Sequence, residues 1–255
     1  MQIPHSEFRI TFLGVFSLAM PKNQNLIIER WDCRLRFAKE GRARYISHLD
    51  LMRTMQRAIK RAKVPIWYTQ GFNPHMYLMF PLALPLGTDS RTESMDIALT
   101  EDIPFDKLLS QLNAAMPEGL YFVNAARPVR KHTDISSAEY VIEALFPADF
   151  PALDQWNSFT GRDVINVEKR VKPKKGRHKS TPSVKLVDIK PHISVLSAEQ
   201  QDNTLRLCMR LPAGTEFNLN TGVVMDAFAA FTGVEPEEIY TKRTKILCAD
   251  GEEFT

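Results

Sequence analysis

The chain has 255 residues, of which 44% are hydrophobic and 25% are charged, and its formal net charge at pH 7 is +3. These values are average for a soluble globular protein, so they exclude a chain that is disordered throughout. No apolar run reaches the roughly 18 residues that a membrane-spanning helix needs, and we expect no membrane partner.

Residues 1–29 are expected to be an unstructured or mis-started extension. The run FRITFLGVFSLAM within them loosely resembles a signal peptide. However, Arg9 is the only full positive charge before its apolar part, and Glu7 offsets that charge. Met20 is a more natural start, shortly before the first expected strand.

Hydrophobic periodicity predicts a first unit over residues 30–128. A helix is expected from Ser47 to about Lys63, because Ser47 and Asp50 resemble a capping box and Pro65 stops the helix. Pro104 is expected to be the first residue of a second helix that continues over 105–116. Strands are expected at 31–39, 66–69, 76–82, 93–100 and 120–126.

Residues 129–249 repeat this order of elements without obvious sequence identity, and 250–255 form a polar tail. Strands are expected at 138–147, 164–171, 184–199, 203–211 and 237–248, and helices at 151–161 and 220–233. The order β-α-β-β-α-β in each half is typical of the split βαβ, or ferredoxin-like, plan. We therefore expect an α+β protein with two tandem ferredoxin-like halves; one continuous α+β domain is the alternative.

Positive charge is concentrated in residues 30–63, which hold eleven Lys or Arg and three Asp or Glu, a balance of +8. One side of the expected helix is apolar and predicts a buried face, formed by Met52, Met55, Ile59 and Ala62. Another side carries four cations with no acidic residue four positions away: Arg53, Arg57, Lys60 and Arg61. Like charges at this spacing destabilise a helix, which favours an external anion such as RNA phosphate. A solvated basic surface and an acidic protein partner are the alternatives.

Two histidines near this helix are further candidates. His48 stands in the first turn, where free backbone N–H groups attract anions. Asn73 and His75 belong to a turn at 71–75 that would shape the binding pocket. Either imidazole could serve as a base in RNA cleavage, although purely local roles in the helix start and in the turn are the simpler interpretations.

A basic loop is expected at residues 168–183, because seven Lys or Arg lie between Lys169 and Lys179. Flexible basic loops bind phosphates without reading sequence, so Lys174, Lys175 and Arg177 are candidate nucleic-acid-binding residues. An inert solvated loop is the alternative.

The aromatic residues Trp67, Tyr68 and Phe72 follow the basic helix. Aromatic side chains in such a place could stack on unpaired bases. Packing in the core is the favoured interpretation for Trp67 and Phe72.

The three cysteines, Cys33, Cys208 and Cys248, are far apart and form no CxxC pair, which argues against a zinc site, an iron–sulfur cluster or a disulfide framework. Sparse cysteines fit a reducing cytosol, so a cytoplasmic location is expected. The sequence also lacks a phosphate-binding glycine loop and a nucleophile elbow. No cofactor and no metal are therefore expected, and catalytic residues are not identifiable.

A longer set of motifs extends from about Arg34 to Leu99. It comprises Phe37, Lys39, Gly41, Ser47, His48, Leu49, Asp50, Arg53, Arg57, Arg61, Pro65, Gly71, Phe72, Asn73, Pro74, His75, Leu86, Gly87, Glu93 and Asp96. With these residues the chain resembles a bacterial family of unknown function whose members are fused to, or encoded beside, radical SAM proteins. The second half is more weakly similar, at 187–193 and 242–244.

The chain departs from this family at Met76 and Tyr77, where the family has a proline and a basic residue. It also lacks the CxxxCxxC motif of a radical SAM core. The resemblance therefore implies a stand-alone partner of a radical SAM protein and not the enzyme that cleaves SAM.

Together, these features predict an RNA-binding accessory module for a radical SAM enzyme in tRNA or rRNA modification, without catalytic activity of its own. One alternative is a subunit that docks on the radical SAM enzyme without touching RNA. Another is a metal-independent endoribonuclease that uses His48 or His75.

Overall fold

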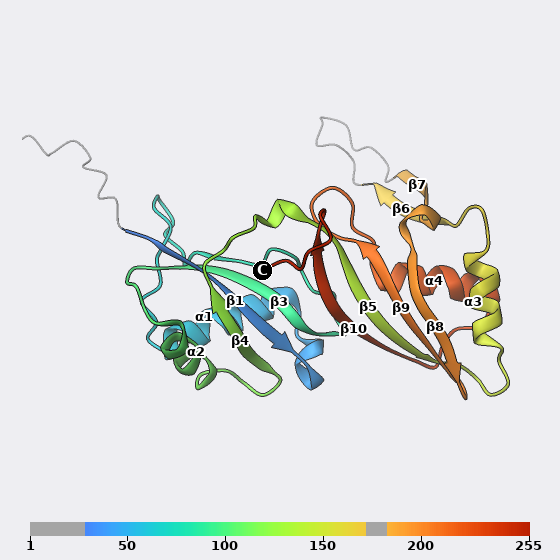
Figure 1. The fold of residues 1–255 in the computed structure, drawn as a ribbon, viewed down its shortest axis with the longest axis horizontal. Coiled ribbons are helices and arrows are strands. Elements are labelled where there is room, and N and C mark those ends of the chain that lie inside the picture. The colour runs from blue at the N-terminus through green and yellow to red at the C-terminus, as the bar shows by residue number, and fades with distance from the viewer. Residues whose placement is uncertain (1–28, 172–182) are drawn as a thin grey trace, which may run out of the picture.

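The computed structural model describes residues 29–171 and 183–255. It is a mixed α+β protein in which helices lie against one large β-sheet (Figure 1). The strands of this sheet are β1 (Trp31–Lys39), β2 (Leu78–Met79), β3 (Thr88–Leu99), β4 (Leu120–Ala126), β5 (Ile135–Leu145), β8 (Ser194–Gln201), β9 (Thr204–Pro212) and β10 (Glu238–Cys248). The α-helices are α1 (His48–Arg61), α2 (Phe105–Asn113), α3 (Ala152–Thr160) and α4 (Thr221–Thr232).

The large sheet runs through both halves of the chain in the order β4-β1-β3-β10-β5-β9-β8, and β2 pairs with β3. Every neighbouring pair is antiparallel except β3 and β10, which are parallel over Thr88–Thr241 to Ser90–Arg243. A separate two-stranded sheet pairs β6 (Asn166–Val171) with β7 (Ser183–Asp188). The short parallel contact between β3 and β10 thus joins the first half to the second.

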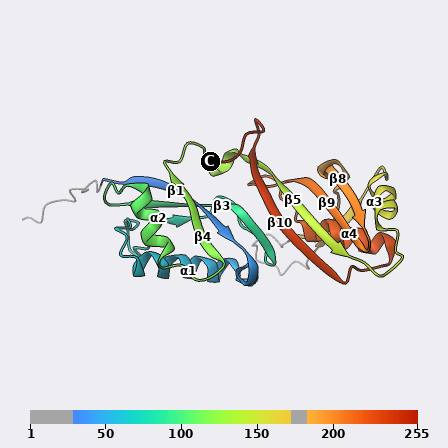
Figure 2. The same ribbon diagram turned by 60° about the horizontal axis from the view of Figure 1, so that its bottom comes forward.

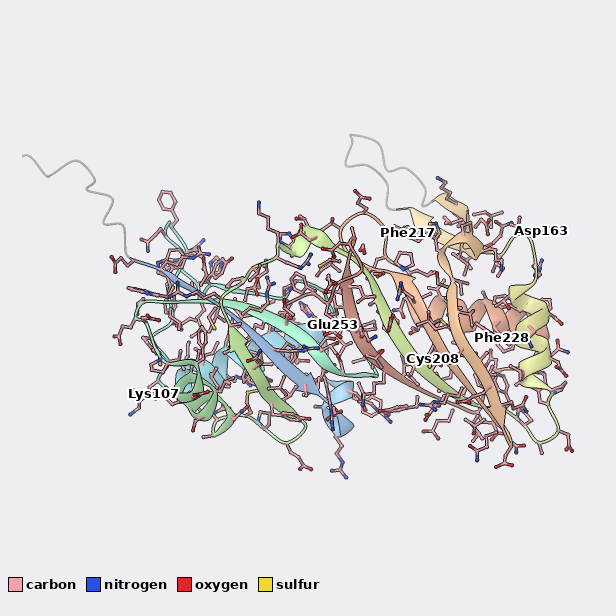
Figure 3. All side chains as sticks on the ribbon, viewed as in Figure 1. Lys107, Asp163, Cys208, Phe217, Phe228 and Glu253 are labelled. Carbon is pink, nitrogen blue, oxygen red and sulfur yellow. The ribbon has the colours of Figure 1, made fainter. Side chains whose placement is uncertain are left out.

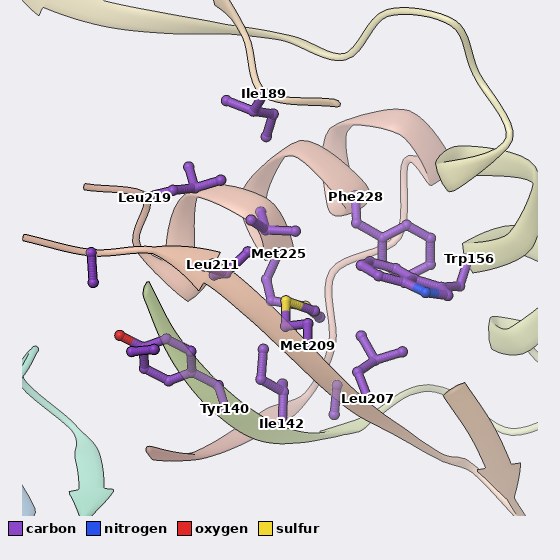
Figure 4. Close-up of a cluster of buried hydrophobic side chains, with 14 of the residues drawn as sticks. Tyr140, Ile142, Trp156, Ile189, Leu207, Met209, Leu211, Leu219, Met225 and Phe228 are labelled. Carbon is purple, nitrogen blue, oxygen red and sulfur yellow. The ribbon is translucent and has the colours of Figure 1, made fainter. Parts of the chain in front are cut away.

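Each half has its own hydrophobic core. In the view of Figure 1, α1 lies behind β1 and β4, and α4 lies behind β8 and β9; Figure 2 shows α1 along the lower edge. The core of the second half contains Trp156, Met209 and Phe228 (Figure 4). Leu82 comes from the first half but packs in this second core, whereas Phe80 packs against the first core. The segment after β2 therefore crosses from one core to the other.

The beginning of α1 agrees with its expected cap. The Ser47 side chain accepts a hydrogen bond from the Asp50 backbone N–H at 3.2 Å and donates one to the Asp50 carboxylate at 2.7 Å. The buried face of α1 consists of Leu51, Met55, Ala58 and Ile59. Met52 and Ala62, which were expected on this face, are only partly buried. The face is rotated toward Leu51 because the helix packs on β1 and β3, whose inward side chains meet that side.

Several other elements differ from their expected form. Residues 66–69 make only isolated bridges at Ile66 and Tyr68, and only Leu78 and Met79 of the run 76–82 form a strand. Pro104 is the N-cap of α2 and not its first helical residue. β3 begins at Thr88, five residues before the expected start.

Residues 250–255, expected to be a polar tail, fold back on the sheet. Phe254 is buried and its backbone N–H donates to the Ile246 carbonyl at 2.9 Å. Glu253 pairs with Arg36 at 3.3 Å, and Figure 3 shows Glu253 in the middle of the molecule, between the two halves. The guanidinium of Arg34 lies 4.1 Å from the centre of the Phe254 ring. The end of the described chain thus covers part of the first half.

Candidate nucleic-acid interface

The cationic side of α1 faces solvent over the length of the helix. Arg53, Arg57, Lys60 and Arg61 are all exposed, while the opposite side of the helix packs on the sheet. A helix with one face fixed in the core holds these four side chains on a rigid backbone. The structure therefore brings together the four cations that the spacing placed on one side.

Two of the four cations have partners within the chain. No acidic residue lies four positions from Arg53, as expected, but the Asp50 carboxylate, three positions away and also adjacent on a helix, lies 3.3 Å from its guanidinium. This pair is exposed on both sides and contributes little to stability. Arg61 donates to the Ala115 carbonyl at 2.6 Å, and its charge is not compensated by any carboxylate of the described residues. Within residues 29–171 and 183–255, Arg57 and Lys60 form no ion pair.

The Asp50 carboxylate has a lowered pKa, caused first by the hydrogen bond from Ser47 and then by Arg53 and Arg57. Asp50 therefore stays ionised at the helix start and compensates part of the local positive charge. The uncompensated charge of α1 lies toward its C-terminal half, around Arg57, Lys60 and Arg61.

His48 is the first residue of α1 and is exposed. Its ring packs edge-on against Phe80, with 5.1 Å between ring centres. It makes no hydrogen bond to another described residue. His48 therefore lies at the opposite end of α1 from Lys60 and Arg61, and the structure does not gather it with them.

His75 closes a short protruding loop, which we call the finger (residues 68–76). The backbone N–H of Thr69 donates to the His75 carbonyl at 2.9 Å, and the backbone N–H of His75 donates to Thr69 Oγ1 at 3.1 Å. His75 Nδ1 lies 3.0 Å from Thr69 Oγ1 and 3.1 Å from the Asn73 carbonyl. Because a carbonyl can only accept, the contact with Asn73 requires the hydrogen on Nδ1. The imidazole thus fixes the shape of the loop, and the exposed Asn73 side chain lies within that loop.

The remaining candidates, Lys174, Lys175 and Arg177, lie outside the described residues. The strands that flank their segment, β6 and β7, form a hairpin, so the expected loop at 168–183 is shortened by the strand residues at its two ends.

A buried charged cluster at the junction of β3 and β10 did not emerge from the sequence. Arg243 and Glu93 are each 2% exposed, and Nη1 of Arg243 donates to both carboxylate oxygens of Glu93, at 3.0 and 3.1 Å. Arg243 also donates to the Tyr140 hydroxyl at 3.2 Å and to the Ala83 carbonyl at 2.9 Å. Burial is the largest effect on the pKa of Arg243 and acts to lower it, but the attractions and hydrogen bonds of Glu93 and Tyr140 together outweigh burial, and the pKa is raised. Glu93 belongs to β3 and Arg243 to β10, the two strands that pair where the halves meet.

The same junction contains a buried lysine and a second carboxylate. Lys39 is 1% exposed and donates to the Arg44 carbonyl at 3.0 Å. Burial lowers the pKa of Lys39, while Glu93 and Asp89 partly counteract this effect. Asp89 accepts a hydrogen bond from the Tyr240 hydroxyl at 2.7 Å, and its other carboxylate oxygen has no partner among the described residues. Within this group, the hydrogen bond from Tyr240 to Asp89 is a further polar link between the two halves.

A second buried ion pair lies further along β3. Arg34 contacts both carboxylate oxygens of Asp96, at 2.7 and 2.8 Å, and donates to the Thr255 backbone oxygen at 2.8 Å. Glu93 and Asp96 thus bind different arginines, since residues three apart on a strand point to opposite faces of the sheet. The signal for these pairs in the sequence was the presence of charged residues inside strand patterns, which usually indicates a buried partner.

Within the described part of the chain, no group of three or more His, Cys, Asp or Glu side chains could hold a metal ion. None of the helices in that part is both long enough and apolar enough to cross a membrane.

The family model described as "uncharacterized protein conserved in bacteria" (DUF2344) matches residues 33–221. This match covers most of the chain and includes α1, the finger and the buried pair Arg34–Asp96 of β3, while Arg243, the partner of Glu93, lies beyond it. The chain belongs to this family. No curated protein matches the DUF2344 chain.

Among solved structures, a chain in the crystal structure of a Cbf5-Nop10-Gar1 complex is similar, at 11% identity and a TM-score of 0.40. The alignment covers 84% of this chain and 48% of that one, so the present chain spans about half the length of its structural neighbour. The similarity is too low to bear on fold or function.

Proposed function

We propose that the protein is an RNA-binding accessory module that acts with a radical SAM enzyme in tRNA or rRNA modification. In this proposal α1 binds phosphates through Arg53, Arg57, Lys60 and Arg61, and the basic segment around Lys174, Lys175 and Arg177 extends the contact. The protein positions RNA and has no catalytic role of its own.

The observation that supports this proposal is the charge on the exposed side of α1. Among the residues that the structure describes, Arg53 alone of these four cations is paired with a carboxylate, and that pair is exposed and contributes little. The helix backbone that carries these cations is already ordered, so it loses no conformational freedom when they meet a row of phosphates, and their binding releases condensed counterions from the RNA. A helix with this face is therefore suited to a polyanion.

A salt series tests the proposal. We expect the affinity for RNA to fall steeply with salt, and Arg57→Ala combined with Lys60→Ala to reduce the slope of log K against log salt by about 1.5 to 2. The matched control is Arg206→Ala with Lys245→Ala, which removes the same charge from cations that are exposed but paired with carboxylates. An equal loss in both double variants, or a flat salt response, would reject α1 as the RNA-binding surface.

The radical SAM partner is supported by the resemblance of residues 34–99 to proteins fused to, or encoded beside, such enzymes. Copurification of the tagged protein with a radical SAM enzyme would test it. Treatment with nuclease separates direct contact from tethering through RNA, since only a direct contact survives it.

A subunit that docks on the enzyme without RNA is the second candidate. It is favoured by exposed apolar residues on β7, where Val184 and Leu186 are 56% and 62% exposed. In this case Val184→Ser with Leu186→Ser should weaken copurification, and the α1 double variant should not.

We also propose that each half is a ferredoxin-like unit. The supporting feature is strand order: β4-β1-β3-β2 in the first half and β10-β5-β9-β8 in the second are the same order, with antiparallel neighbours in both. The β6–β7 hairpin is then an insertion between α3 and β8.

A further inference from the structure

We infer that the finger stacks Phe72 on an unpaired nucleobase of the bound RNA, an inference that rests on the proposed function and specifies the kind of RNA. Phe72 lies at the tip of the finger and is fully exposed, at 106% of its reference area. This position contradicts the expectation that Phe72 packs in the core.

The loop that carries Phe72 is closed by several hydrogen bonds. A bridge joins Tyr68 to Met76, the backbone groups of Thr69 and His75 bond to each other, and the His75 ring holds the Asn73 carbonyl. Gly71 has φ +133°, a conformation that other residues rarely adopt and that allows the chain to bend before Phe72. The ring is therefore presented on a preorganised turn, which reduces the entropy that binding must overcome.

The surroundings of Phe72 fit a base better than a protein surface. The side chains of Gln70, Asn73 and His75 are exposed and polar, and the exposed apolar side chains of the finger are Phe72, Pro74 and, at 42%, Tyr68. A stable protein–protein contact buries about 800 Å² on each partner, far more than these three side chains offer. Aromatic rings stack on any base, and neighbouring amides can bond to base edges.

The electrostatics of the region also favour RNA. Residues 64–88 contain no Asp or Glu, so no carboxylate within this segment repels a phosphate. Six residues, 62–67, connect the C-terminal end of α1, where Lys60 and Arg61 are exposed, to the base of the finger. In Figure 2 the segment after α1 lies at the same end of the first half as the end of the helix. A strand held by the α1 cations can thus place an unpaired base on the finger.

The test compares a single-stranded RNA oligonucleotide with a duplex of the same sequence by fluorescence anisotropy, using the full chain. We expect Phe72→Ala to weaken binding of the single strand by about tenfold and to leave duplex binding and the salt slope unchanged. Phe72→Trp should keep the affinity. Leu86→Ala is the control, because Leu86 is another exposed apolar residue, 66% exposed, outside the finger.

A single strand that carries 2-aminopurine gives an independent readout, since stacking on an aromatic ring quenches its fluorescence. Quenching by the unaltered protein and by Phe72→Trp, but not by Phe72→Ala, supports the inference. If salt-dependent RNA binding is intact and Phe72→Ala has no effect, or weakens duplex and single strand equally, the inference is overturned while the proposed function stands. If the unaltered protein binds neither RNA, both are overturned, and loss of a protein partner on Phe72→Ala would then assign the finger to protein docking.

Discussion

The buried pair Arg243–Glu93 allows a quantitative test of how the two halves are held together. Substitution Glu93→Gln keeps the size of the side chain but removes the negative charge, so Arg243 remains charged at 2% exposure. Its bonds to Tyr140 and to the Ala83 carbonyl are neutral and cannot replace the lost charge. We therefore expect Glu93→Gln to destabilise the protein substantially.

The size of this effect follows from the geometry. At the observed 3.0 Å separation, Coulomb's law with an effective dielectric constant of about 20 gives roughly 5.5 kcal/mol of attraction. Measured losses on removing one member of a buried pair are about 3–5 kcal/mol, since the surroundings relax. We expect the free energy of unfolding to fall by about 3–5 kcal/mol.

Urea unfolding provides the assay. Trp156 lies in the core of the second half and Trp31 beside that of the first, so tryptophan fluorescence together with circular dichroism shows whether both halves unfold in one transition. The control is Glu199→Gln, which breaks an exposed pair with Arg206 at 3.2 Å and should cost less than about 1 kcal/mol. If Glu93→Gln is no more damaging than this control, the pair is not a buried electrostatic link and the reasoning fails. Replacing both members, with Glu93→Leu and Arg243→Met, should recover much of the loss.

Three further tests address individual residues. Burial raises the pKa of the Cys33 thiol to about 12, whereas Cys208 is partly exposed. A thiol reagent should therefore modify Cys208 first, and Cys208→Ser should remove the fast phase of labelling. Rapid labelling of Cys33 would contradict the structure. Burial and the hydrogen bond to Asp89 raise the pKa of Tyr240 to about 12 from an ordinary value near 10. Its neutral form is therefore favoured in the folded state, and its contribution to the free energy of unfolding is present below pH 10 and lost as the pH rises toward 12. The stability of the unaltered protein should therefore fall relative to Tyr240→Phe between pH 10 and 12, and parallel pH profiles would refute this. Gly119 has φ +80°, and a Cβ there would lie 2.5 Å from the Glu40 carbonyl oxygen, whereas Gly41 has φ +60° and open space around it. Gly119→Ala should therefore lower the free energy of unfolding by more than the about 1–2 kcal/mol expected for Gly41→Ala. Equal losses in urea unfolding would show that the contact relaxes.

The local elements of the fold were largely accessible from the sequence. The cap at Ser47, the stop at Pro65 and the alternation in β1, β4 and β9 are determined by neighbours within a few residues, so a local pattern predicts them. The four cations of α1 follow from helical spacing in the same way.

The elements that the sequence did not reveal depend on distant contacts. The run 88–92 is polar and resembles a turn, yet it forms the start of β3 because β10, about 150 residues later, pairs with it and buries Asp89 and Ser90. Residues 76–82 are apolar enough for a strand, but Phe80 packs against the first core and Leu82 in the second, so the pairing of β2 with β3 ends at Met79. Phe72 is apolar and was expected inside, but a closed turn carries it outward. No pattern within a short window contains this information.

The pairing of β3 with β10 also has a consequence for how the chain is made. During translation all of the first half leaves the ribosome long before β10 is synthesised, so the Thr88–Ser90 edge of β3 stays open through most of that time. An open strand edge with free backbone groups readily pairs with other chains. Chaperone contact during synthesis, or rapid completion of the polypeptide, would therefore protect this protein from aggregation more than it would protect one whose halves close independently.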